Sequence, residues 1–300
     1  MYYLAYGFLY ALSLLPIRVL YLFSDFVYFV IYHVFGYRKQ VVRNNLNIAF
    51  PERTAEEKKK IEKQFYKNFI DNFIETLKIL SGGAAYASKH FTIDNTQLEE
   101  EYRKGKKLQF LLGHNFNWEL ANVGATRYLS FPMIVVYMPV QNKTFDRIML
   151  KLRKASNNIL LPATEMRKEM IPYRNTQYLL VLVADQVPGD VSRAYWLNFF
   201  GRPTPFVWGP ERGAVAGNLS VAFGQIYKVK RGNYRMEYEI CTSEAATLPA
   251  GELTRQYARF LEKVIRQHPE MWLWSHRRWK KEWKPEYSEL WIDEEPPKGS

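Results

Sequence analysis

Short apolar segments separated by helical patterns are the feature that most limits how this chain can fold. Leu108–Gly113, Met133–Tyr137 and Tyr178–Ala184 are mostly apolar and too short for buried helices. The residues between them have the periodicity of helices. Strands that are apolar on both faces are typical of a parallel sheet covered on both sides. The sequence therefore predicts an α/β fold with a mostly parallel central sheet flanked by helices.

One long helix is predicted over Thr54–Leu80. Thr54 and Glu57 have the spacing of a capping box, and apolar residues then recur every three or four positions. We expect the run from 81 to 83 (Ser-Gly-Gly) to end this helix. A stretch rich in glycine and proline occupies 189–213. Later strands and a last helix are predicted at Leu219–Tyr227, Tyr234–Cys241 and Leu253–Gln267.

The N-terminal residues form an apolar, aromatic run. Between Tyr2 and Tyr37 only Arg18 and Asp25 are charged, and Pro16 divides the run into helices expected at about 2–15 and 17–35. Tyrosine and phenylalanine rings favour a membrane interface, and the basic cluster that follows favours the cytoplasmic side. We expect a membrane anchor over 1–45 and a catalytic domain over 46–300. A cleaved signal peptide and a buried core helix are the alternatives.

Charge and cysteine content narrow the classes of partner. The formal net charge of +12 favours anionic partners, such as lipid headgroups, nucleic acid or an acidic carrier protein. A single cysteine, Cys241, excludes an intramolecular disulfide and a multi-cysteine zinc site. The five histidines do not have the short spacing of metal ligands, so no metal is expected.

The sharpest local motif runs from Gly113 to Glu119. It follows a predicted strand and opens a helix, which is where ligands bind in open α/β sheets. We interpret His114 as a general base whose ring is oriented by the carboxylate of Glu119. A purely structural hydrogen bond between the two is the alternative.

Further polar residues follow later elements. Asp185 and Gln186 end another apolar strand, so they are expected to face the same cleft as His114, unless Asp185 only caps the turn at Pro188. Arg202 is a candidate phosphate ligand or simply a solvated side chain. The segment from 269 to 284 interleaves basic residues with tryptophan, which suits an anionic membrane surface better than nucleic acid once the apolar N-terminus is considered.

Together these motifs resemble the late (lauroyl/myristoyl-type) acyltransferases of lipid A biosynthesis, within the lysophospholipid acyltransferase superfamily. The resemblance covers nearly the whole chain. The segments that carry it are Leu14–Arg18, Arg43–Pro51, the His114-x4-Glu119 box, Ala184–Gln186, Phe199–Thr204 and Met271–Arg278.

The resemblance implies a bacterial enzyme at the cytoplasmic face of the inner membrane, which moves a fatty acyl group from acyl carrier protein to a hydroxyl of a lipid A precursor. It implies that His114 is the base and Glu119 its partner, and that Arg277 or Arg278 lies close to the phosphate of the lipid. The expected partners are acyl carrier protein, an anionic phosphorylated lipid and the membrane, with no nucleic acid. No cofactor is expected beyond acyl-acyl carrier protein as co-substrate.

One position departs from the family pattern. Where the family often has Tyr-Arg-Pro after the second strand, this chain has Met138 between Tyr137 and Pro139, and methionine cannot bind phosphate. Either Arg147 or Arg153 on the next helix takes over, or the acceptor is a lysophospholipid, a glycolipid or an aminolipid. A catalytically silent membrane-surface module is the alternative from another class.

Overall fold

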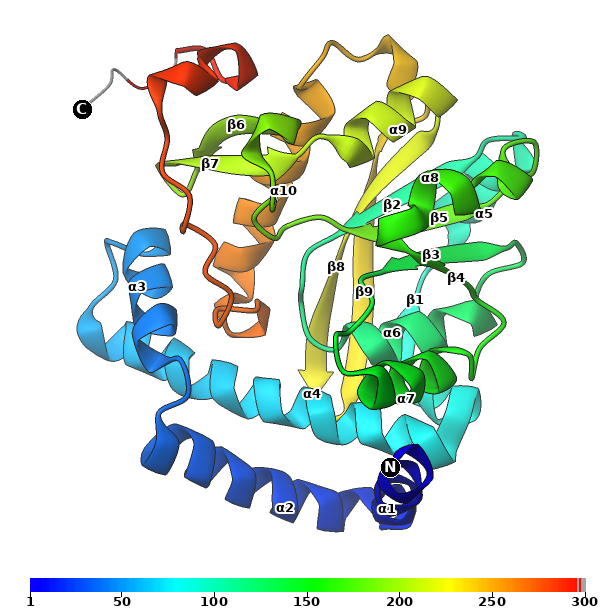
Figure 1. The fold of residues 1–300 in the computed structure, drawn as a ribbon, viewed down its shortest axis with the longest axis vertical. Coiled ribbons are helices and arrows are strands. Elements are labelled where there is room, and N and C mark those ends of the chain that lie inside the picture. Colours follow the sequence, from blue (N-terminus) through cyan, green and yellow to red (C-terminus); the bar gives the residue numbers. More distant parts are fainter. Residues whose placement is uncertain (296, 298–300) are drawn as a thin grey trace.

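A seven-stranded sheet forms the centre of the computed structural model, which describes residues 1–295 and 297 (Figure 1). The strand order is β1-β9-β8-β2-β5-β3-β4, and only β8 and β9 pair antiparallel. This confirms the predicted α/β class with a mostly parallel sheet. The strands are β1 (Phe91–Ile93), β2 (Leu108–Leu112), β3 (Met133–Tyr137), β4 (Ile159–Pro162), β5 (Leu179–Val183), β8 (Ser220–Lys230) and β9 (Asn233–Thr242).

Helices cover both faces of the sheet (Figure 1). On one face α10 packs Tyr257 and Phe260 against Phe223 of β8. On the other face Glu75 of α4 accepts a hydrogen bond from the hydroxyl of Tyr234 on β9. The helices after the N-terminal region are α4 (Ala55–His90), α5 (Thr96–Arg103), α6 (Trp118–Gly124), α7 (Lys143–Arg153), α8 (Met166–Glu169), α9 (Gly209–Gly217) and α10 (Glu252–Gln267).

The two N-terminal helices are confirmed as α1 (Tyr2–Leu14) and α2 (Ile17–Phe29), with Pro16 as the residue that separates them. The helix after Pro16 continues as a π-helical turn over Val30–Phe35. Both helices pack on α4, which runs alongside α2 in Figure 1. Leu20 of α2, for example, is buried against Ile70 and Ile74.

The outward sides of α1 and α2 are apolar. Within the part of the chain that the structure describes, Ile17–Phe35 is the one helical segment long and apolar enough to cross a membrane by length and composition. Its exposed side chains include Leu22, Phe23, Phe26 and Phe29.

Helix α4 begins as predicted but extends further. Thr54 accepts from the backbone of Glu57, and the Glu57 side chain accepts from the backbone of Thr54, which completes the capping box. The predicted end at 81–83 is confirmed, because Gly83 leaves the helical conformation (φ 55°) and forms a kink, and a second helical segment then continues the same element to His90. Glycine permits this left-handed kink without a steric cost.

The boundary expected at residue 45 falls inside a further helix, α3 (Lys39–Ala49). Val42, Leu46 and Ala49 of this helix belong to the main core and are fully or almost fully buried. The Asn45 side chain donates to the backbone oxygens of Trp274 and His276, at 2.8 and 2.7 Å. Helix α3 is therefore packed into the same body as the sheet.

A separate hairpin lies in the stretch rich in glycine and proline. Strands β6 (Ala194–Phe199) and β7 (Arg202–Val207) pair antiparallel. The turn between them places Phe200 and Gly201 at positive φ. The hairpin carries Phe199 and Phe206 into the core beside the C-terminal tryptophans.

Candidate active site

His114 and Asp185 meet at the carboxyl ends of two neighbouring strands. His114 follows β2 and Asp185 follows β5, and the two strands pair in parallel, so their ends lie side by side. His114 Nδ1 lies 2.5 Å from Asp185 Oδ1, and the His114 backbone N–H donates to Asp185 Oδ2 at 2.8 Å. The carboxylate therefore holds both the ring and the backbone of the histidine.

Asp185 is itself fixed and ionised. It is buried, and the indole N–H of Trp272 donates to Oδ2 at 2.6 Å. Burial acts to raise the pKa of Asp185, but the neighbouring His114 and the hydrogen bonds to the charged carboxylate outweigh it and lower the pKa to about 2. Asp185 is thus a negative charge beside the imidazole throughout the neutral range.

These contacts determine which nitrogen of His114 is available. A carboxylate only accepts hydrogen bonds, so Nδ1 carries the proton and Nε2 keeps its lone pair. The amide nitrogen of Gln186 lies 3.1 Å from Nε2 and donates to it. The ring is partly exposed, and Trp118 packs against it edge-on. Nε2 is therefore an acceptor at the edge of the protein, where a substrate hydroxyl could replace the amide.

Glu119 does not contact the His114 ring, so the prediction that it orients the imidazole is wrong. Helix α6 starts at Trp118, and from its first turn the buried Glu119 side chain reaches Arg153 of α7. Arg153 Nε lies 3.2 and 3.0 Å from the two carboxylate oxygens, and Nη2 lies 2.5 Å from Oε1. The structure thus forms two pairs, His114–Asp185 and Glu119–Arg153.

Three of the other predicted arginines are exposed. Arg147 on α7 stacks on the ring of Tyr2, with 4.0 Å from its Cζ to the ring centroid. Arg202 begins β7, and Arg277 lies in the C-terminal segment that follows α10. Of the four arginines considered so far, only Arg153 is held against a buried residue of the candidate site.

Arg278 is fully buried, which corrects the expectation that it meets a lipid phosphate at the surface. It lies over the ring of Phe206 and donates to the backbone oxygen of Pro205 at 2.9 Å. Burial lowers its pKa to about 10, against the opposing effect of Asp185. Its guanidinium therefore lies inside the core and not at the surface.

A second histidine borders the site. The backbone N–H of Val187 donates to His276 Nε2 at 3.2 Å. Burial lowers the pKa of His276 to about 4, and the nearby Arg278 lowers it further while Asp185 opposes the change. His276 is therefore neutral at neutral pH and fixes the chain just after Gln186.

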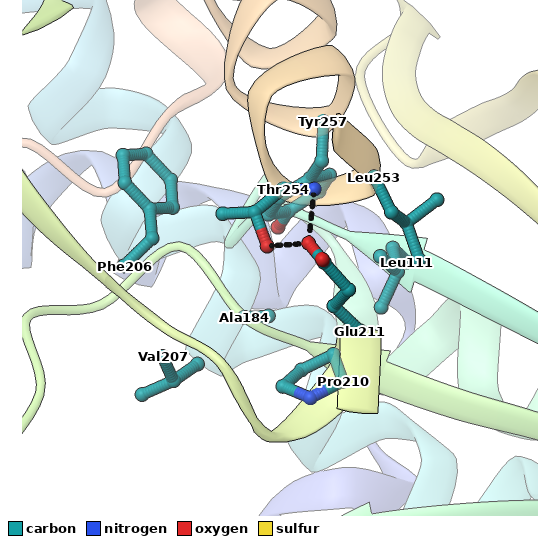
Figure 2. A pocket seen from close by; sticks show the side chains of 9 residues that line it. All are labelled: Leu111, Ala184, Phe206, Val207, Pro210, Glu211, Leu253, Thr254 and Tyr257. Atoms are coloured by element: carbon teal, nitrogen blue, oxygen red, sulfur yellow. Dashed lines mark hydrogen bonds between the residues drawn. The ribbon is translucent and has the colours of Figure 1, made fainter. Parts of the chain in front are cut away.

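A small cavity lies behind the strand ends (Figure 2), where Leu111 and Ala184 meet Phe206 and Tyr257. Its volume of about 10 Å³ is enough for roughly one water molecule. Glu211 borders it and accepts from the backbone and hydroxyl of Thr254, at 2.9 and 2.6 Å. This space is too small for a fatty chain and contains none of the predicted site residues.

Sequence reasoning missed several side chains that build the site. Trp272, His276 and Asn117 hold Asp185, Val187 and the start of α6. Asn117 was detectable, because asparagine directly before a helix is a common N-cap. Trp272 and His276 lie in the segment Met271–Arg278 that carries the resemblance, but the spacing in that segment does not connect them with Asp185 or Val187. In residues 1–295 and 297, no cluster of three or more histidine, cysteine or acidic side chains is arranged to hold a metal ion.

The fold and the site define an α/β enzyme with a histidine–carboxylate pair at the carboxyl edge of its sheet. A family model described as bacterial lipid A biosynthesis acyltransferase matches residues 1–281. The chain therefore belongs to the bacterial lipid A biosynthesis acyltransferases, and it is an acyltransferase.

Two curated relatives carry matching names. The chain is 23% identical over 252 residues to the lipid A biosynthesis palmitoleoyltransferase of Escherichia coli (strain K12), covering 81% of this chain and 79% of that protein. The same values relate it to the lipid A biosynthesis acyltransferase of Shigella flexneri.

Proposed function

We propose that this protein transfers a fatty acyl group from the thioester of acyl carrier protein to a hydroxyl of a lipid A precursor, with His114 as the general base. The contact between His114 and Asp185 carries the proposal, because it leaves Nε2 as a proton acceptor at the edge of the fold. The family membership supports the reaction class. The net charge of +12 suits an acidic carrier and a phosphorylated lipid.

In the proposed reaction, His114 Nε2 removes the proton of the acceptor hydroxyl. At the same time, the oxygen of that hydroxyl attacks the thioester carbonyl. The new ester bond forms as the carbon–sulfur bond breaks, and the leaving thiolate takes the proton from the imidazolium. Asp185 stabilises that imidazolium and keeps the ring in one tautomer. Because the donor is already activated, the protein needs no serine or cysteine nucleophile of its own.

The Glu119–Arg153 pair is assigned a different part of the same reaction. Glu119 binds the Nε and Nη2 edge of the guanidinium, which fixes its direction and leaves Nη1 for an anionic group. We propose that Arg153 binds a phosphate of the acceptor in place of the arginine that the family often has at the position of Met138. Arg147, which is exposed on the same helix, is the second candidate for binding this phosphate.

We further propose that α1 and α2 lie in the cytoplasmic leaflet of the inner membrane rather than across it. Helix α2 packs along α4, and α4 carries exposed lysines at positions 59, 60, 63 and 67. A spanning α2 would draw these charges toward hydrocarbon, which is costly. In the leaflet plane the apolar side meets lipid and the lysines stay in water.

The experiment that tests the base is a transfer assay with purified protein, acyl-acyl carrier protein and a lipid A precursor. His114→Ala is expected to lower turnover by a factor on the order of 10² or more, the usual scale for losing a general base. His268→Ala is the matched control, since His268 directly follows α10 and its ring stacks on Tyr227. Near-normal turnover of the purified His114→Ala protein would refute the assignment.

The acceptor is tested by mass spectrometry of lipids from cells that lack the protein and cells that regain it. Restoration of an acyl group on lipid A supports the proposal. Restoration on a lysophospholipid, glycolipid or aminolipid would keep the reaction and replace the acceptor. No restored acyl group on any lipid would favour a catalytically silent membrane-surface module.

A further inference from the structure

A buried glutamate that the proposed chemistry does not use lies beneath the His114 loop. Glu75 of α4 is fully buried and accepts three hydrogen bonds. Oε1 accepts from the hydroxyl of Tyr21 at 2.9 Å, and Oε2 accepts from the hydroxyl of Tyr234 at 2.7 Å and from the amide of Asn117 at 3.1 Å. Buried polar groups that are held on every side in this way fix a single local arrangement.

One of the three donors belongs to the loop that carries the candidate base. Asn117 lies between His114 and Glu119 and is fully buried. Its amide nitrogen donates to Glu75, while its oxygen accepts from the backbone N–H of Leu120 at 3.2 Å and caps α6. Both polar atoms of Asn117 are thus in use, so its contact with Glu75 helps to fix the start of α6.

Another of the three donors belongs to the apolar N-terminal region. Tyr21 reaches Glu75 from α2, whose opposite side carries the exposed Leu22 and Phe26. Ser24, one turn along, donates instead to Asp71 at 2.7 Å. The packing of α2 on α4 is therefore linked to the His114 loop by the hydrogen bonds from Tyr21 and Asn117 to Glu75.

We propose that Glu75 is a positioning residue: the way α2 packs on α4 affects, through Glu75, the geometry of the loop between His114 and Glu119. This inference rests on the proposed function, because it assigns that loop to catalysis. Glu75 touches no substrate, so its effect should fall on the rate of the chemical step and not on substrate binding. Loss of the Tyr21 hydroxyl should loosen Glu75 and, through Asn117, the start of α6.

The central variant is Tyr21→Phe, which removes one hydroxyl and keeps the ring. We expect kcat for acyl transfer in vesicles of phosphatidylglycerol and phosphatidylethanolamine to fall by about 3-fold to 10-fold, with KM for both substrates and vesicle binding unchanged. Ser24→Ala is the matched control: it removes one buried hydrogen bond from the same helix face but lies outside the connection. Its kcat should remain within 2-fold of the parent at a similar loss of thermal stability.

Variants of Glu75 supply the second readout. Glu75→Gln should retain most of kcat, because its amide oxygen can accept from Tyr234 and Asn117 while its nitrogen donates to the Tyr21 oxygen. Glu75→Leu should lower kcat more than Tyr21→Phe does; if it does not fold, the comparison of Tyr21→Phe with Ser24→Ala decides alone. Equal kcat in those two variants would overturn the proposal. His114→Ala, assayed in parallel, separates this outcome from failure of the proposed function, since only an active His114→Ala protein rejects the latter.

Discussion

The partner of the His114 ring shows what sequence spacing can and cannot reveal at the scale of a residue. His114, Glu119 and Asp185 were all recognisable as candidate site residues from their places after apolar strands. The pairing was not, because Glu119 is near in sequence but points from the first turn of α6 toward α7. Asp185, 71 residues away, arrives because β2 and β5 are neighbours, and strand order is set by the packing of the whole sheet.

The Glu119–Arg153 pair gives a prediction about buried charge. Arg153→Met should destabilise the protein by about 3–5 kcal/mol, because it leaves the Glu119 carboxylate buried without a cation. Adding Glu119→Gln should restore most of that stability but not the transfer activity, if Arg153 also binds substrate. Urea unfolding and the transfer assay measure the two effects. Equal stabilities of the single and double variants would contradict the argument.

His276 gives a prediction about pH. Its folded pKa of about 4 lies below the ordinary value of 6.5, so the unfolded chain binds a proton first as the pH falls. The contribution of His276 to stability is complete above pH 6.5 and is lost as the pH falls toward 4. The urea midpoint of the parent protein should therefore drop more between pH 7 and pH 5 than that of His276→Gln. Identical pH slopes would show that His276 does not titrate in this way.

At the scale of elements, strong local patterns were sufficient and weak ones were not. The capping box of α4, the division at Pro16 and the strands β2, β3 and β5 follow from short-range chemistry. The β6–β7 hairpin was hidden because Pro203 and Pro205 interrupt a strand pattern, which a two-stranded hairpin tolerates. Strand β1 has only three residues and pairs with β9, so no local periodicity marks it.

Helix α10 depends on a cap that comes from another element. Glu211 of α9 accepts from the backbone of Gly251 at 2.5 Å. It also accepts from Thr254 at the start of α10, as Figure 2 shows. Glu211→Ala should lower the free energy of unfolding by about 2 kcal/mol, since it leaves helix N–H groups without an acceptor. The exposed Glu289→Ala is the control in urea unfolding. A difference below about 0.5 kcal/mol between the two would show that the cap contributes nothing.

At the scale of the whole molecule, composition predicted the apolar N-terminal helices. It did not predict how α2 is attached to α4 and to the β8–β9 turn. Arg231 in the β8–β9 turn lies 2.7 Å from both Asp25 of α2 and Asp71 of α4. These three charges are 46 to 206 residues apart in sequence, and no local pattern connects them. Only the assembled fold shows that α2 is held by charges on one side and is apolar on the other.

The outward side of α2 gives a prediction about membrane binding. Replacing Leu22, Phe23, Phe26 and Phe29 by serine should weaken binding to phosphatidylglycerol vesicles by more than about 10-fold, because apolar side chains lose their burial in lipid. Sedimentation with vesicles measures this. Ile171→Ser with Val229→Ser is the control, since both side chains are exposed but lie outside α1 and α2. Equal sedimentation of the two variants would refute an interfacial role for this side.

The attachment of α2 also has a practical consequence for the design of shortened forms of this enzyme. Truncation before α3 would take away the hydroxyl that reaches Glu75, the serine that reaches Asp71 and the aspartate that faces Arg231. The shortened protein would leave Glu75 and Asp71 each with one hydrogen-bond donor fewer and would expose the apolar surface around Ile70. Polar substitutions on the outward side keep every one of those partners, so they are the better route to a well-behaved sample.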